Sequence, residues 1–461
     1  MDTTWQIRSN VKWHDGAPFT SDDLMFTFAA RKENATLAAG AASTLRTMVS
    51  ASAPDPLTFA IHWNQVNVRA AEAVGLDPLP RHLLETAYQT TAPETFAAQP
   101  YFRTEFVGLG PYRLASWAQG VEMDLVRFDD YYLGPAPIDR IVFRFVPDPT
   151  AMVATILAGA ADVVLPPGVE LDAAATVQRQ WEGTGNRVVV GGLDDLNSAY
   201  TLQFRPEYAK PLAGLPNRDV REALFRAIDR AAMTEALTVG LAPAADSWVS
   251  PMHALRRELE AAIPQYPLDP GRSSQLLAQA GWARGPDGVL VHSQTGERFV
   301  LELAGPARSA LQKQQAIIAD GWKPMGVEGE IFVVPSALDL IAETRSTRPG
   351  IYLGSIAAER YFYQDQLHAR EITSSANWSL RNRGGYSSPA VDAIHDQLRV
   401  TIDDAQRVGL QRELVRTAMA DVALWPLYWD VYPVLAVASV KGQIHPSKGG
   451  TLTNIMEWDK V

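Results

Sequence analysis

Residues 106–148 contain three short strand patterns in succession, and a helix pattern follows them. Pro149 stands where the first turn of a helix tolerates proline, and Gly159 ends the helix before the short apolar run 161–165. This order of strands, helix and strand is typical of layered α/β proteins. We therefore predict an α/β fold.

Other segments carry the apolar periodicity of amphipathic helices. The strongest runs from Asn217 to Gly240, where Val220, Leu224 and Ile228 recur at four-residue spacing. We expect it to form one helix. Further helices are expected at 269–281, 388–402 and 403–422.

The first residues predict a strand, a turn and a capped helix. Apolar residues alternate with polar ones over residues 3–13, and Asp15 with the glycine after it favours a turn. Thr20 and Asp23 resemble a capping box at the start of the helix. We expect His14 to be a solvent-exposed turn residue and not a catalytic base, because the adjacent side chains of His14 and Asp15 do not converge on one point.

Composition limits the classes of function. A chain of 461 residues usually forms two or three lobes, and a net charge of −11 argues against binding to nucleic acid, whose phosphates need Lys and Arg. There is no cysteine, so disulfides, thiolate nucleophiles and Cys-based metal sites are excluded. No stretch approaches ~18 uninterrupted apolar residues, and the N-terminus lacks the pattern of a signal peptide.

The pattern of titratable residues offers little for catalysis. None of the eight histidines lies within four residues of another, so no local metal-ligand pair exists, and no metal or cofactor is expected. Glycoside hydrolysis requires two facing carboxylates about 5–9 Å apart. Adjacent acids instead point to opposite faces of a strand or cap a helix. Such pairs occur at 22–23, 129–130, 194–195 and 403–404.

Aromatic residues are the one surplus, with 12 Trp and 14 Tyr. Several in the last third of the chain are interleaved with Arg and Asn, a composition that suits a cleft gripping a ligand by flat faces and a few polar groups. Core packing is the alternative for each of them. The group comprises Tyr361, Tyr363, Trp378, Tyr386, Trp425, Tyr428 and Trp429.

The order of several segments resembles one protein family over nearly the whole chain. The stretch WQIRSNVKWHDGAPFTSDDLMFTF is similar to the strand, turn and helix near the front of the family 5 extracellular solute-binding proteins, the receptors of ABC importers. The resemblance continues in GLGPYRLASW, DYYLGPAPIDRIVFRFVPDPTAMVATILAGAADVV, NRDVREALFRAIDRAAM, YPLDPGRSSQLLAQAGW, GGYSSPAVDAIHDQL and ALWPLYW.

The resemblance implies a two-lobed α/β fold of the periplasmic-binding-protein type, which closes on its ligand like a hinged trap. Residues 1–215 and 431–461 would form the first lobe and residues 216–430 the second. Family members carry a signal peptide and some tens of residues before this first strand, whereas here Met1 falls just ahead of it. We therefore expect a receptor that lacks its N-terminal part. The resemblance also implies a location in the periplasm or at the exterior of the cell envelope.

The expected function is a receptor that captures a small solute between its lobes and delivers it to ABC permease subunits in the membrane, as a monomer without catalytic residues. The solute would be an oligopeptide, an oligosaccharide or a metal chelate. The alternatives are a glycoside hydrolase with Trp platforms and a non-transporting sensor or chaperone on the same fold. Ligand contacts are expected from Trp248, Tyr361, Tyr363, Trp378, Arg381, Asn382 and Trp429.

Peptide-binding members of the family hold the peptide amine with an Asp-rich stretch after a buried strand of the second lobe. The matching region here, residues 351–372, lacks that pattern. Glu359 or Asp365 would have to take the role, which leaves the ligand open.

Overall fold

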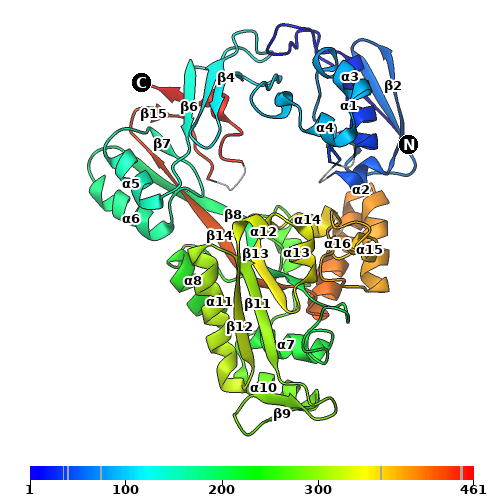
Figure 1. Cartoon of the computed structure of the whole chain (residues 1–461), viewed down its shortest axis with the longest axis vertical. Helices are drawn as coiled ribbons and strands as arrows, with labels where there is room; N and C mark the ends of the chain where they lie inside the picture. The colour runs from blue at the N-terminus through cyan, green and yellow to red at the C-terminus, as the bar shows by residue number, and fades with distance from the viewer. Residues whose placement is uncertain (35, 39–40, 73–74, 364–365, 447–449) are drawn as a thin grey trace. The chain divides into compact units, whose positions relative to one another are not determined.

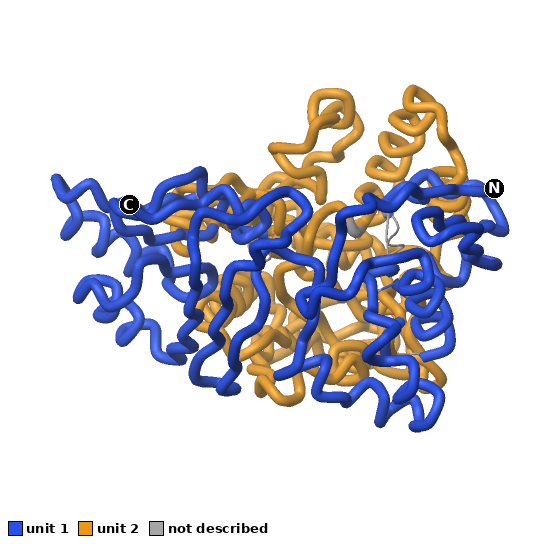
Figure 2. The backbone as a smooth tube through the Cα atoms, turned by 90° about the horizontal axis from the view of Figure 1, so that it is seen from above, with its two compact units in different colours: residues 1–190, 432–461 blue, residues 191–431 orange. Residues whose placement is uncertain are grey.

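The computed structural model describes residues 1–34, 36–38, 41–72, 75–363, 366–446 and 450–461, without the side chains of residues 42, 43, 360 and 363. Its packing divides the chain into unit 1, residues 1–190 and 432–461, and unit 2, residues 191–431 (Figure 2). The sequence suggested divisions near 215 and 430. Two strands, β8 (Arg187–Leu202) and β14 (Trp425–Ala436), contain the boundaries between the units.

Unit 1 contains two three-stranded antiparallel sheets, ordered β1-β3-β2 and β4-β5-β6, with helices beside them (Figure 1). Its elements are β1 (Asp2–Gln6), α1 (Ser21–Glu33), α2 (Ala42–Leu45), β2 (Met48–Asp55), β3 (Thr58–Trp63), α3 (Arg81–Thr90), α4 (Pro93–Ala97), β4 (Tyr112–Ala118), β5 (Glu122–Arg127), β6 (Arg140–Arg144), α5 (Pro149–Leu157), β7 (Val163–Val164), α6 (Leu171–Gln180), β15 (Val440–Lys441) and β16 (Asp459–Lys460).

The first strand is shorter than the predicted 3–13. β1 ends at Gln6, whose partner Thr58 is the first residue of β3. Beyond it the N–H of Ile7 still donates to Leu57 O at 2.7 Å, but β3 offers no further backbone to continue the ladder. The predicted strand therefore stops where its partner begins.

The predicted capping box at the start of α1 is confirmed. The carboxylate of Asp23 accepts the backbone N–H of Thr20 at 3.0 Å. It also accepts the N–H of Arg81 at 2.9 Å and the indole N–H of Trp13 at 3.3 Å. Asp23 is buried, so a residue identified as a local cap also joins three segments of unit 1.

His14 lies differently from the expectation. The turn forms at Asp15, and the glycine after it has a φ of +90°, as predicted. The His14 ring, however, is half-buried against Phe128, with the ring centroids 5.2 Å apart. The N–H of Gly108 donates to Nδ1 at 3.1 Å, so the proton lies on Nε2, which donates to Gly110 O at 3.0 Å. His14 therefore links the turn to a second segment instead of facing solvent.

Acidification is expected to destabilise unit 1 through His14. Burial lowers the pKa of His14 below its usual 6.5. The unfolded chain then takes up a proton before the folded chain does, so the free energy of unfolding falls as the pH drops below about 6.5. Urea denaturation of the wild type and of His14→Gln between pH 8 and 5 measures this effect. The variant should lose part of the slope, and an identical slope in both proteins would contradict the assignment.

Unit 2 is built on a sheet ordered β12-β11-β13-β8-β14, and β7 of unit 1 pairs with the unit 1 end of β14. Its elements are α7 (Arg218–Arg226), α8 (Arg230–Thr238), α9 (Arg256–Glu260), α10 (Pro270–Gln279), β9 (Trp282–Arg284), β10 (Leu290–His292), β11 (Val300–Pro306), α11 (Ser309–Trp322), β12 (Glu328–Val334), α12 (Ser336–Asp339), α13 (Ala342–Thr347), β13 (Ile351–Ala357), α14 (Arg360–Tyr363), α15 (Pro389–Val400) and α16 (Asp404–Ala420). Within the described ranges, no helix is both long enough and apolar enough to span a bilayer.

The single helix predicted between Asn217 and Gly240 is wrong. The structure has two helices, α7 and α8, separated by a short turn. Asp229 causes the break, because its side chain accepts the N–H of Ala232 at 2.8 Å and so caps the start of α8. The apolar spacing continues through the turn, which is why periodicity alone suggested one helix.

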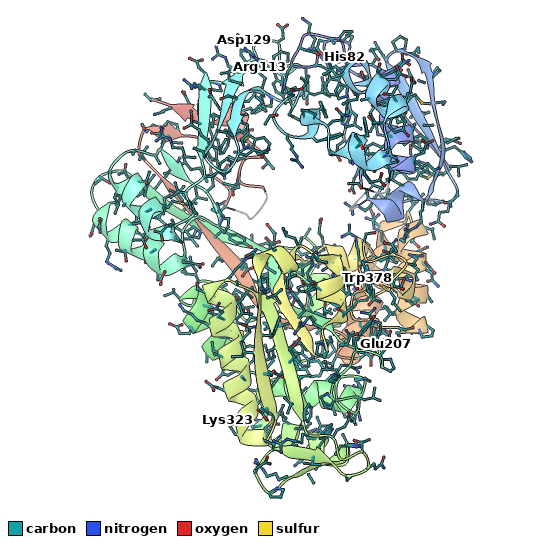
Figure 3. All side chains as sticks on the ribbon, in the orientation of Figure 1. His82, Arg113, Asp129, Glu207, Lys323 and Trp378 are labelled. Atoms are coloured by element: carbon teal, nitrogen blue, oxygen red, sulfur yellow. The ribbon has the colours of Figure 1, made fainter. Side chains whose placement is uncertain are left out.

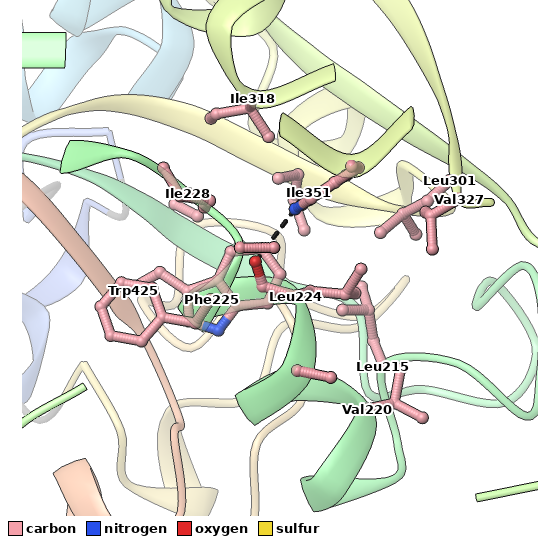
Figure 4. Close-up of a cluster of buried hydrophobic side chains, with 14 of the residues drawn as sticks. Leu215, Val220, Leu224, Phe225, Ile228, Leu301, Ile318, Val327, Ile351 and Trp425 are labelled. Atoms are coloured by element: carbon pink, nitrogen blue, oxygen red, sulfur yellow. Dashed lines mark hydrogen bonds between the residues drawn. The ribbon is translucent and has the colours of Figure 1, made fainter. Parts of the chain in front are cut away.

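Helices cover both faces of the unit 2 sheet. Successive residues of a strand point to opposite faces, and Tyr352 and Leu353 of β13 show which helices lie on each. Leu353 belongs to a buried hydrophobic cluster that includes Leu311 and Ile318 of α11. Ile318 is labelled in Figure 4 together with Ile351, which lies two residues before Leu353 on β13. Tyr352 instead donates its hydroxyl to Asp339 of α12 at 2.5 Å. Therefore α11 covers one face, and α12 with α13 covers the other.

Candidate ligand site in unit 2

The topology of the sheet points to a site at the carboxyl ends of β11 and β13. These strands are parallel neighbours, yet the chain leaves them in opposite directions. From β11 it passes through α11 to β12, whereas from β13 it passes through residues 358–424 to β14, beyond β8. Ligands of open α/β sheets bind at carboxyl ends where connections diverge in this way.

Three carboxylates lie at the end of β13, and we call them the acidic rim: Asp194, Asp195 and Glu359. Asp195 on β8 is the register partner of Ala357, the last residue of β13. The N–H of Ala358 donates to Asp194 O at 3.1 Å, and Glu359 follows directly. Antiparallel pairing therefore joins an acidic pair on one strand to an acid more than 160 residues away.

The acidic rim favours a positive charge. Partial burial raises the pKa of Asp194, and the negative charges of Asp195 and Glu359 raise it further. A cationic group close to Asp194 would relieve this repulsion. Among the residues that the structure describes, no three His, Asp or Glu side chains are placed to hold a metal ion.

Three of the aromatic residues expected to contact ligand are buried in unit 2. Trp248, Tyr361 and Trp429 are each 1% exposed. The rings of Trp248 and Tyr361 lie 5.5 Å apart at 32°. Their cluster also contains Leu196 and Ala358, which flank members of the acidic rim. These rings thus pack in the same core as residues next to the rim. Their direct contact with a ligand stays a prediction.

Apart from Trp378, the remaining aromatic residues are either buried or have side chains outside the described part of the structure. Tyr386, Trp425 and Tyr428 are buried, which agrees with the alternative of core packing. The side chain of Tyr363 lies outside the described part of the structure, as does Asp365.

Trp378 and Arg381 lie in a loop between β13 and α15, and we call residues 374–381 the tip. Both side chains are half-buried, so each presents part of its surface to solvent (Trp378 is labelled in Figure 3). The side chain of Asn377 organises the turn, because its Oδ1 accepts the N–H of Ser379 at 2.9 Å. A planar ring and a guanidinium fork three residues apart can stack on a ligand and bind an anionic group.

Asn382 is placed differently from Trp378 and Arg381. It is 3% exposed, and its amide N–H groups donate to His368 O at 3.1 Å and Tyr386 O at 2.7 Å. Its Oδ1 accepts the N–H groups of Gly385 and Tyr386, both at 3.1 Å. The amide is thus engaged within the loop, and a ligand would have to displace these bonds to reach it.

From the sequence, the acids at 194–195 were expected to be neighbours on a strand without a joint function, and their grouping with Glu359 was not predicted. The pair alone carries no functional signal, since neighbours on a strand point apart. A signal exists only in the pairing of β8 with β13, which the sequence does not display.

The chain matches a known family model over residues 2–370, described as bacterial extracellular solute-binding proteins, family 5 Middle. Heme-binding protein A of Haemophilus influenzae is 28% identical over 304 residues, covering 62% of this chain and 52% of that protein. Oligopeptide-binding protein AppA of Bacillus subtilis is 24% identical over 332 residues, covering 71% of this chain and 58% of that protein. The chain thus spans about half the length of the relatives it matches.

Solved structures share the fold. NikZ from Campylobacter jejuni, solved with Ni(L-His), has a TM-score of 0.82 at 19% identity, and the match covers 100% of this chain and 88% of the NikZ chain. AppA from Bacillus subtilis, solved with a nonapeptide, has a TM-score of 0.80 at 19% identity, and the match covers 100% of this chain and 87% of the AppA chain. The predicted α/β fold of the binding-protein type is confirmed. The family match over most of the chain settles its membership: it belongs to the family 5 bacterial extracellular solute-binding proteins.

Proposed function

We propose that this chain is the solute-binding receptor of an ABC importer, which captures a small solute outside the membrane and passes it on chemically unchanged. The family match over residues 2–370 carries this proposal. The partners would be the permease subunits of the importer, and the location the periplasm or the outer face of the cell envelope. We further propose that the receptor acts as a monomer.

The site in unit 2 suggests a solute with a cationic group. The acidic rim would hold an amine, while Trp378 and Arg381 of the tip would contact apolar and anionic parts of the solute. A short peptide combines these groups. The relatives are named for heme and oligopeptides, and NikZ was solved with a nickel chelate, so these chemistries belong in the same screen.

The family match gives no support to a glycoside hydrolase. A sensor or chaperone on the same fold would also bind solute without altering it. Genes for two permeases and an ATPase beside this one would favour the importer.

A bound solute is expected to stabilise the protein and to be recovered intact. Trialanine, N-acetyl-trialanine, cellotriose and the nickel–histidine chelate serve as probes in thermal unfolding and calorimetry. At 100 times its dissociation constant a probe stabilises the native state by ~2.7 kcal/mol, which raises the melting temperature. Trialanine should bind at least ~10-fold more tightly than its N-acetyl form, because acetylation removes the cation that the rim attracts.

The variants Trp378→Ala and Arg381→Ala should each weaken trialanine binding by roughly 5- to 30-fold, the equivalent of ~1–2 kcal/mol. Arg272→Ala, at an exposed position of α10, is the matched control and should bind as the wild type does. Conversion of a probe in proportion to protein would overturn the receptor assignment. Wild-type affinity in both tip variants would place the ligand elsewhere.

A further inference from the structure

The tip rises from a narrow neck formed by two short arms of the chain. The N–H of Asn382 donates to Glu371 O at 2.8 Å, and the N–H of Thr373 donates to Asn382 O at 3.2 Å. Residues 371–373 and 382–383 thus lie side by side and close the base of the loop. Whatever holds these two arms also sets the direction in which the tip points.

Arg205, just beyond the end of β8, binds both arms of the neck. Its Nη1 donates to Thr373 O at 2.9 Å, and its Nη2 donates to Arg383 O at 2.8 Å. Nη2 also donates to Ser346 O at the end of α13. One guanidinium group therefore joins the central sheet, the helical connection before β13 and both arms of the loop.

The guanidinium is itself held in place. Its Nε donates to Gln203 Oε1 at 3.2 Å, and the group stacks on the ring of Tyr208 at 4.6 Å. The amide of Gln203 donates in turn to Ser346 O at 3.0 Å and to Arg348 O at 2.8 Å. Arg205 is 9% exposed, and its described hydrogen-bond acceptors are carbonyl and amide oxygens. Burial without a carboxylate among these acceptors is costly, and it lowers the pKa of Arg205.

Residues 384 and 385, which follow the second arm, pack against the chain just beyond the end of β8. A side-chain Cβ at Gly385 would lie 2.4 Å from Cγ of Arg205. The N–H of Phe204 donates to Gly384 O at 2.9 Å, so the backbone here runs against the end of the strand. The neck thus has little freedom to shift while Arg205 remains in place.

We propose that Arg205 is a positioning residue for ligand binding: it does not touch the solute, but it fixes the direction of the tip and so the placement of Trp378 and Arg381. The inference rests on the proposed function, in which the tip contacts the solute. A lysine at this position keeps the charge, but its ammonium group cannot reproduce the planar set of N–H groups with which the guanidinium reaches both arms. The arms would then be joined by fewer bonds, and the tip would sample more orientations.

Arg205→Lys is expected to loosen the tip and to weaken binding together. Amide hydrogen exchange across residues 374–381 should accelerate at least ~10-fold, and trialanine affinity should fall ~10-fold. With 5-fluorotryptophan in the protein, the fluorine resonance of Trp378, assigned through Trp378→Phe, should shift or broaden. Gln203→Ala, which removes the acceptor of the Nε bond but keeps the guanidinium, should change the same signals less and serves if Arg205→Lys does not fold.

The matched control is Arg230→Lys. Arg230 is a half-buried arginine of unit 2 whose guanidinium also donates to backbone carbonyls, to Ala245 O and, at 2.6 Å, to Tyr266 O. It should destabilise unit 2 without changing tip exchange, the fluorine signal or trialanine affinity. In a Trp378→Ala background, Arg205→Lys should cost far less affinity than in the wild type, because it acts through the tip.

Unchanged tip exchange in Arg205→Lys would overturn the inference, as would a loosened tip with wild-type affinity or fully additive losses in the double variant. A wild type that binds none of the probes would contradict the proposed function instead. The exchange measurement would still decide whether Arg205 holds the tip.

Discussion

Replacing Trp322 with alanine is expected to lower the free energy of unfolding of unit 2 by about 3–5 kcal/mol. Trp322 at the end of α11 is fully buried, and its ring meets Trp425 edge to face at a centroid distance of 6.0 Å. Its indole N–H donates to Leu224 O at 2.9 Å, near the end of α7 (Figure 4). Alanine leaves a cavity and removes the donor from a buried helix-end carbonyl. Urea denaturation followed by circular dichroism measures the loss.

Trp322→Phe separates the two contributions. It keeps an aromatic ring against Trp425 and loses the hydrogen bond, so it should cost less than the alanine variant by about 1–2 kcal/mol or more. A loss below about 1 kcal/mol in Trp322→Ala would mean that α11 does not depend on this contact.

Gly384→Ala is expected to cost about 3 kcal/mol and to disturb the loop that carries the tip. An ideal Cβ at this position would lie 1.9 Å from the carbonyl oxygen of Leu202. The obstacle is backbone of β8, which cannot rotate away as a side chain can, so the loop must lift from the sheet. The hydrogen bond from Phe204 N–H to Gly384 O would then be lost. Chemical denaturation gives the stability, and exchange across residues 374–381 reports the loop.

Gly409→Ala is the control for this substitution. Gly409 lies on an exposed position of α16, where an added Cβ meets nothing within 4 Å. Alanine should stabilise the helix by about 0.5–1 kcal/mol, because it restricts the unfolded chain. Equal losses in both glycine variants would remove the steric explanation for Gly384.

Local chemistry made part of the fold predictable. Two helix starts were expected from a proline or a cap, at Pro149 and Asp269, and in both the capping side chain accepts a backbone N–H. These caps act within three residues, so the sequence displays them directly. The prediction of one helix through Asp229 was wrong, because a capping residue inside an apolar repeat is hard to distinguish from an exposed residue within a helix.

The site was predicted less well than the fold. Aromatic content indicated Trp248, Tyr361 and Trp429, but it does not distinguish a ring in the core from one on a ligand surface. The contacts of Arg205 join residues that are 141–178 positions apart in the chain. The acidic rim joins Glu359 to a pair of acids more than 160 positions earlier. Pairing of strands brings them together, and a single sequence carries no local pattern for such pairing.

The two boundary-crossing strands, β8 and β14, also impose an order on folding. Unit 2 is one continuous stretch, but unit 1 needs residues after 431 to complete itself. Ile138, Val163 and Leu165 pack against Val434, Ala436 and neighbours that are made last. At ribosomal rates the 241 residues between positions 190 and 432 take on the order of 10–50 s to synthesise. During that interval the apolar surface of unit 1 lacks its partner, so the time for which a newborn chain is open to aggregation or chaperones is set by the length of unit 2.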